Sequence, residues 1–352
     1  MDQRQAKQES SLRRVGCVDA VKGIAIILMV YGHIAQGGMH RHLWDDMPGW
    51  PKAILFGDAF IYSFHMPAFF FAAGLFLAGS AKRHGRPNFI LERVKTILYP
   101  YVLWTLLSTA VLPISSRFML YSKPSHWRDI LVALGTGNIS WFLPTLFACQ
   151  IFALLVLRLP HWLQMIIAIA AGLLVPVSDI TVLFMPFLYF PFVVAGMWFS
   201  ADRLSVLERL PKRWAAGGFA VLLALQLALI GAFGEVTRWN EVPVGLTGIA
   251  MLFFLSSAIR GTITDKWLQW FGEGSLAIFL LSPFFTGAAR EFLVRVFHVI
   301  HPVPYIAFTT LVSIVVPALI WSRQDQLRMR WMFRWPASKK GSMTSRAQTV
   351  TG

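Results

Sequence analysis

Charged residues are scarce in this chain of 352 residues. They make up 14% of the sequence, whereas about 25% is usual for a soluble protein. Hydrophobic residues make up 56%, and long apolar segments recur from residue 18 to residue 321. The scarcity of charge excludes an ordinary soluble enzyme. We therefore expect an integral membrane protein with one helical domain.

Cysteine is almost absent too. Cys17 and Cys149 are the only two, and neither their spacing nor their context suggests a metal site or a required disulfide. The chain also lacks a Walker loop, a dinucleotide-binding glycine fingerprint, a His-Glu-x-x-His pair and a Gly-x-Ser-x-Gly elbow. These absences exclude the commonest signatures of nucleotide binding, zinc proteolysis and serine hydrolysis. We expect no metal and no bound cofactor.

Acidic residues are few, so the formal net charge is +15. This excess does not require a nucleic-acid partner, because polytopic membrane proteins collect Lys and Arg in their cytoplasmic loops. We predict a bundle of about ten transmembrane helices, at 18–37, 53–79, 97–114, 140–158, 162–178, 181–199, 214–234, 242–259, 267–288 and 303–321. With both termini cytoplasmic, 23 Lys and Arg lie on inside segments and 8 on outside loops. The bias predicts an N-in, C-in topology.

Three regions are expected. Residues 1–16 form a basic cytoplasmic tail, 17–322 the transmembrane domain, and 323–352 a basic cytoplasmic tail that is suited to the anionic inner leaflet and is disordered from 337 onward. The alternative reading of the N-terminus is a signal peptide, but no small-x-small cleavage site follows the apolar run. A bacterial cytoplasmic membrane is the expected location, and the oligomeric state is left open.

The first predicted span carries three ionisable residues on one stripe. Lys22 and His33 are 11 residues apart, which brings them to within about 20° on a helix, and Asp19 lies about 60° to the other side of Lys22. Ionisable groups inside a membrane usually face a bundle interior or a wet cavity. The plainer alternatives are an N-cap for Asp19, a snorkelling Lys22 and an interhelical hydrogen bond for His33.

Later spans contain four further candidates. Asp58 and His65 share a face with Tyr62 in the second span, and Asp58 sits at about the depth of His33, where a carboxylate can orient an imidazole. Trp141 opens the fourth span, where its alternative role is interfacial anchoring. Ser282 precedes a proline in the predicted outer half of the ninth span, where its alternative role is to satisfy a backbone carbonyl freed by the proline.

The loop 80–96 is the most basic internal segment. Its simplest interpretation is topological, because basic loops hold helix ends on the cytoplasmic side. The functional interpretation is a phosphate site for a cytosolic donor, with Arg93 and Lys95 as ligands.

Five stretches, in order, resemble the acyltransferase-3 family of integral membrane acyltransferases, and the fucose 4-O-acetylase-like branch is the most similar in pattern. They are Asp19-Ala-Val-Lys22-Gly23-Ile24-Ala25 with His33, Phe64-His65-Met66-Pro67 through Gly74, Phe89 through Arg93 with Lys95 and Pro100, Trp141-Phe142-Leu143-Pro144, and Gly274-Ser275-Leu276-Ala277-Ile278. Ser282 stands where the family often has a histidine.

The resemblance implies transfer of an acyl group, most often acetyl from cytosolic acetyl-CoA, to a sugar hydroxyl of a surface or lipid-linked glycan. His33, with Asp19 and Lys22, is then the expected catalytic group, because acyl transfer to a hydroxyl needs a base and histidine is the usual choice. A secondary transporter or flippase with a proton relay is the rival from another class. A non-catalytic membrane subunit is the third possibility.

Overall fold

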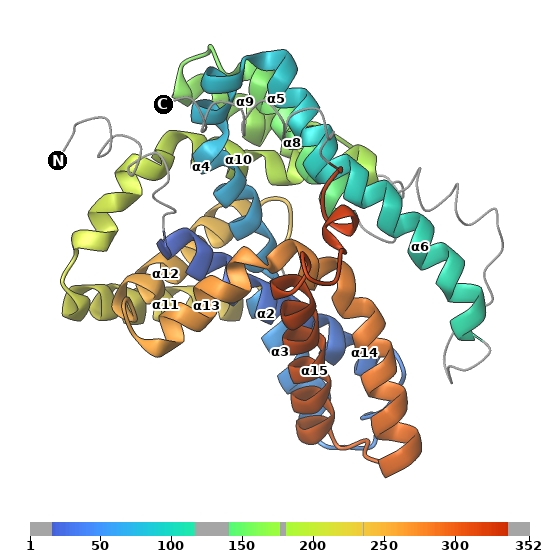
Figure 1. Ribbon diagram of the computed structural model, residues 1–352. Coiled ribbons are helices and arrows are strands. Elements are labelled where there is room, and N and C mark those ends of the chain that lie inside the picture. The colour runs from blue at the N-terminus through green and yellow to red at the C-terminus, as the bar shows by residue number, and fades with distance from the viewer. Residues whose placement is uncertain (1–15, 117–140, 177–180, 235, 337–352) are drawn as a thin grey trace.

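The computed structural model describes residues 16–116, 141–176, 181–234 and 236–336, which are helical and contain no β-strand (Figure 1). In chain order the α-helices are α2 (Gly16–Met39), α3 (Trp50–Tyr62), α4 (His65–His84), α5 (Arg86–Arg93), α6 (Tyr99–Ser116), α8 (Phe142–Val156), α9 (His161–Leu174), α10 (Thr181–Arg209), α11 (Lys212–Phe233), α12 (Glu241–Ala258), α13 (Ile263–Glu273), α14 (Ser275–Phe297) and α15 (Pro302–Ser322). A π-helix, Val94–Leu98, joins α5 to α6, and a 3-10 turn, Arg330–Met332, lies near the C-terminus.

Within the described part of the chain, 7 helical stretches are long and apolar enough to cross a membrane. They are Gly16–Met39, Trp50–His84, Arg86–Val111, Lys212–Phe233, Glu241–Ala258, Ser275–Phe297 and Pro302–Ser322. Three shorter apolar helices, Phe142–Val156, His161–Leu174 and Leu183–Phe199, fall at the fourth, fifth and sixth predicted spans. The all-helical membrane fold is confirmed, whereas ten spans and the N-in, C-in topology stay predictions.

Reporter fusions test that topology. If the three shorter helices also cross the bilayer, reporters fused behind Arg14 and behind Arg334 should both read as cytoplasmic, because 23 of the 32 Lys and Arg residues then lie inside. Opposite readings at the two ends would mean an odd number of crossings and would invert the depth assigned to half of the helices.

The ninth predicted span, 267–288, starts in the wrong place. The Thr262 hydroxyl accepts the Asp265 backbone N–H at 3.2 Å and caps a separate helix, α13, of 11 residues. At 1.5 Å per residue α13 is about 16 Å long, too short to cross a bilayer, and it lies against α2. The helix long enough to cross a membrane is α14, and Ser282 lies in the first half of its residues.

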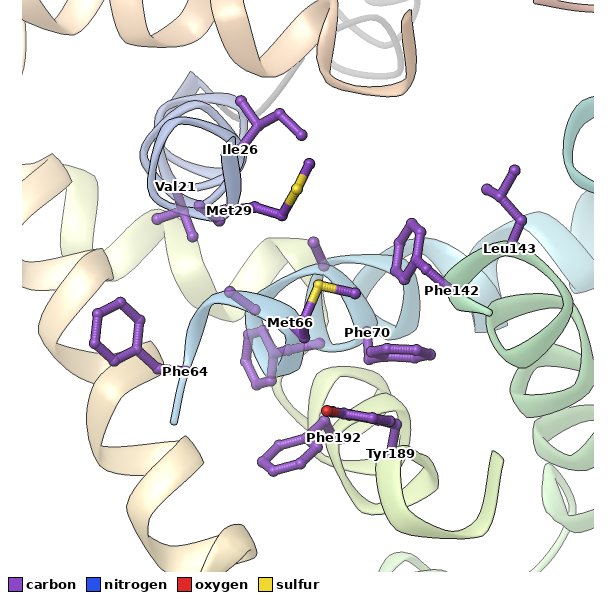
Figure 2. Close-up of a cluster of buried hydrophobic side chains, with 14 of the residues drawn as sticks. Val21, Ile26, Met29, Phe64, Met66, Phe70, Phe142, Leu143, Tyr189 and Phe192 are labelled. Atoms are coloured by element: carbon purple, nitrogen blue, oxygen red, sulfur yellow. The ribbon is translucent and has the colours of Figure 1, made fainter. Parts of the chain in front are cut away.

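Apolar and aromatic side chains from α2, α4, α8 and α10 meet in the core (Figure 2). Phe70 of α4 stacks on Tyr189 of α10, with ring centroids 4.6 Å apart and planes at 11°. Phe142 of α8 meets the edge of the Phe70 ring at 5.4 Å. This aromatic core fixes the helices that carry the candidate residues relative to one another.

Two glycines allow α4 and α10 to cross closely. A Cβ added to Gly74 would lie 2.1 Å from the Val193 carbonyl oxygen, and one added to Gly196 would lie 2.1 Å from the Phe71 carbonyl oxygen. Real side chains do not approach backbone so closely, so only glycine fits at either position. The two backbones are therefore in direct contact at this crossing.

The first part of the C-terminal tail is docked on the helices. The Trp104 indole N–H donates to the Met332 carbonyl at 2.7 Å, and the Trp335 backbone N–H donates to the Lys95 carbonyl at 3.3 Å. The tail therefore packs against the π-helix and α6, and its placement at the inner leaflet stays a prediction. Residues 337–352, predicted to be disordered, lie outside the described residues.

Candidate active site

Asp19 and Lys22 form an ion pair at the N-terminal end of α2, with Nζ 2.7 Å from Oδ1. Lys22 and His33 are 11 residues apart, or about 16 Å along the helix axis. The three residues of the predicted stripe therefore form two separate groups. Asp19 and Lys22 pair with each other, whereas His33 contacts residues of α3.

The His33 imidazole is exposed, although its neighbours Gly32 and Ile34 are buried. Its Nδ1 lies 3.0 Å from the Tyr62 hydroxyl oxygen, and that hydroxyl donates to Gln36 Oε1 at 3.2 Å. Glycine at position 32 makes this approach possible, since a Cβ there would lie 3.0 Å from Tyr62 Cε2. One imidazole nitrogen is thus held by α3 while the ring stays accessible.

His65 lies beside the same tyrosine. Helix α3 ends at Tyr62 and α4 begins at His65, so the short break between them turns the two rings edge to face, with centroids 4.6 Å apart. His65 Nδ1 is 2.8 Å from the Ile61 carbonyl, which only accepts, so Nδ1 carries the proton. Within the described residues its buried Nε2 has no hydrogen-bond partner.

Asp58 lies against α2 at the level of His33, but it does not contact the imidazole. Its Oδ1 would be 3.6 Å from a Cβ at Gly32, and within the described residues this buried oxygen has no hydrogen-bond partner. No ion pair or hydrogen bond joins Asp58 to His33 in the part of the chain that the structure describes. Asp58 and His33 therefore lie at the same level along α2, as predicted. The residue that contacts the imidazole, however, is Tyr62 and not Asp58.

Trp141 belongs to the aromatic core. Its ring stacks on Tyr189, with centroids 5.3 Å apart and planes at 25°, and Tyr189 stacks in turn on Phe70. Interfacial anchoring stays the alternative prediction for Trp141. Glu241, the first residue of α12, is 8% exposed.

Ser282 belongs to a helix kink. Its hydroxyl donates to the Phe279 carbonyl at 3.5 Å. That carbonyl is four residues before Pro283, which has no N–H to offer it. The long hydrogen bond matches the plainer of the two predicted roles, and no contact of Ser282 with either histidine is found among the described residues.

Arg93 and Lys95 lie where α5 passes into the π-helix. The Arg93 guanidinium carbon is 4.6 Å from the centroid of the Phe89 ring, and Nη2 donates to the Ser80 hydroxyl at 3.4 Å. Lys95 Nζ is a loose 3.9 Å from Glu92 Oε1. Both cations keep N–H groups available for phosphate oxygens, and neither lies beside His33.

Sequence reasoning missed Gln36 and Glu241 and left Tyr62 without a role. Gln36 is 3 residues beyond His33 on α2, so helical periodicity places it on the same side. Glu241 is an acidic residue at the start of an apolar segment, which is a general signal for function in a membrane. Among the described residues, no three His, Cys, Asp or Glu side chains cluster so as to hold a metal ion.

Comparison with known families decides the class. The model of the acyltransferase-3 family, described as an acyltransferase domain, matches residues 15–322. The chain belongs to this family. It is therefore a membrane acyltransferase, and nothing in the comparison supports the transporter alternative. No curated protein and no solved structure gives a significant match.

Proposed function

We propose that this acyltransferase moves an acetyl group from cytosolic acetyl-CoA to a sugar hydroxyl of a surface or lipid-linked glycan, in the manner of the fucose 4-O-acetylase-like branch. The observation that carries the proposal is the exposed His33 imidazole, held by Tyr62, in a chain of acyltransferase family. A bacterial cytoplasmic membrane fits such a reaction, because it separates the donor pool from exported glycans.

The chemistry follows from one free imidazole nitrogen. His33 takes the proton from the acceptor hydroxyl as its oxygen attacks the thioester carbonyl. A carbon–oxygen bond forms, the carbon–sulfur bond breaks, and the departing thiolate takes the proton from the imidazolium. His33 as a transient acyl carrier is the variant of this scheme in which the imidazole itself is acylated first. A succinyl donor would react in the same way.

The donor would enter from the predicted inner side. The distance of about 16 Å between Lys22 and His33 along α2 suits a substrate whose phosphates and thioester are separated by a pantetheine arm. Lys22, Arg93 and Lys95 are the cations proposed to hold the phosphates. The acceptor would approach from the other side, beside Trp141 and Glu241, where aromatic faces and a carboxyl group suit a sugar.

Donor binding is tested by removing charge. Arg93→Gln and Lys95→Gln together should raise the KM for acetyl-CoA about 100-fold or more, since each lost charge-assisted hydrogen bond contributes about 1.5–3 kcal/mol, while the acceptor KM changes little. Arg86→Gln, in the same basic segment, is the matched control. If Arg86→Gln alone raises the donor KM as much as Arg93→Gln or Lys95→Gln alone, donor binding depends only on the total charge of the segment.

The acceptor class is tested in cells. Mass spectrometry of exported glycans should find O-acetyl groups in the parent strain and in a deletion strain that carries the wild-type gene, and none in the deletion strain alone. Unchanged glycans in all three would remove the proposal for a carbohydrate acceptor.

A further inference from the structure

Three side chains from α2 and α3 are linked in one line: the Gln36 amide, the Tyr62 hydroxyl and the His33 imidazole. Each member has a limited set of protons to give. The direction of the hydrogen bonds along this line can therefore be worked out, and it decides which nitrogen of His33 is free.

Gln36 sets the direction. Its Oε1 faces Tyr62 and accepts the hydroxyl proton in a 3.2 Å hydrogen bond. An amide oxygen has no proton to give, so Tyr62 must be the donor.

The Tyr62 hydroxyl in turn fixes the position of the proton on His33. A phenol has one proton, and Tyr62 gives it to Gln36 Oε1. The hydroxyl oxygen can then only accept from His33, so the 3.0 Å contact requires a proton on His33 Nδ1. A neutral imidazole with Nδ1–H has its lone pair on Nε2.

We infer that Gln36 and Tyr62 form a directed hydrogen-bond chain that holds His33 as the Nδ1–H tautomer, with Nε2 presented to the acceptor hydroxyl. The inference rests on the proposed role of His33 as base. Tyr62 and Gln36 are then positioning residues. The chain supplies from two helices what a single carboxylate supplies in a Ser-His-Asp triad.

Nitrogen-15 NMR reads the tautomer directly. The full-length protein, labelled in histidine and placed in lipid nanodiscs, should show His33 with a protonated Nδ1 and an unprotonated Nε2. Comparison with His33→Ala assigns the signals. Gln36→Met keeps the side-chain length but removes the acceptor of the Tyr62 proton. Tyr62 then donates to Nδ1, and the tautomer of His33 should invert to Nε2–H.

Tyr62→Phe and its control complete the test. Loss of the hydroxyl should leave His33 as a mixture of tautomers and lower kcat about 10- to 100-fold with little change in either KM, the range found for groups that orient a metal-bound imidazole. Tyr31→Phe, the same change two positions before His33, should alter neither signal nor rate. Tyr31 lines an apolar groove with Ile27 and Ile306.

Two results would overturn the inference: an Nε2–H tautomer in the wild type, or His33 signals that stay the same in both Gln36→Met and Tyr62→Phe. The expected tautomers together with normal turnover of His33→Ala would support the hydrogen-bond chain and refute the proposed base. The two ideas therefore fail separately.

Discussion

Replacing His33 with alanine should abolish acyl transfer and leave a folded, inserted protein. Loss of a general base lowers the rate about 10²- to 10⁴-fold, whereas loss of one interhelical hydrogen bond lowers stability by about 1 kcal/mol. The exposed imidazole makes one hydrogen bond to α3, so its removal disturbs little packing. Turnover of acetyl-CoA by purified protein, measured beside thermal melting, separates the two effects.

His65→Ala is the informative companion. His65 is fully buried and packs on Tyr62, so this change should lower the melting temperature more than His33→Ala does and lower turnover less. The reverse order of effects on turnover would make the buried Nε2 of His65 the candidate base. Near-normal turnover of purified His33→Ala would refute the proposed mechanism without touching the family assignment.

Gly74→Ala should have the largest effect on stability. Its new Cβ would meet the Val193 carbonyl oxygen at 2.1 Å, and a backbone atom cannot move aside like the end of a side chain. Helices α4 and α10 would have to separate, which we expect to lower the free energy of unfolding by about 3 kcal/mol, the upper part of the range for overpacking. Thermal melting in detergent and the yield of monodisperse protein measure it.

Gly79→Ala is the matched control on the same helix, because nothing lies within 4 Å of a Cβ there. It should be neutral, or stabilising by up to about 1 kcal/mol through helix propensity. Equal melting temperatures for the two variants would show that α4 and α10 do not cross as closely as described. Because α4 begins with His65, which packs on Tyr62, separation of α4 from α10 should also lower the activity.

Much of the site is readable from periodicity. Ionisable residues in apolar helices mark a polar interior, and counting along the first two spans places His33 and Asp58 at one depth and His65 beside Tyr62. The structure brings these residues together. The class of enzyme also follows from motif order, and the family match confirms it.

Partners across helices are harder to predict, because sequence gives depth and face but not which helix lies opposite. Gln36 could not be chosen over other polar residues until α3 was seen against α2. The start of the ninth span is misplaced because the apolar residues of α13 continue into α14 without a charge run, and only Gly274 separates the two helices. The hydrogen bond from Trp335 to the π-helix joins residues far apart in the sequence, and no local sequence pattern predicts it.

The most direct test of His33 catalysis is a single experiment on exported glycans. A deletion strain is complemented with the wild-type gene or with His33→Ala at equal membrane levels, and the O-acetyl content of its glycans is measured by mass spectrometry after a pulse of isotope-labelled acetate. We expect labelled O-acetyl groups with the wild type and none above the deletion background with His33→Ala. Equal labelling by both would contradict the role proposed for His33.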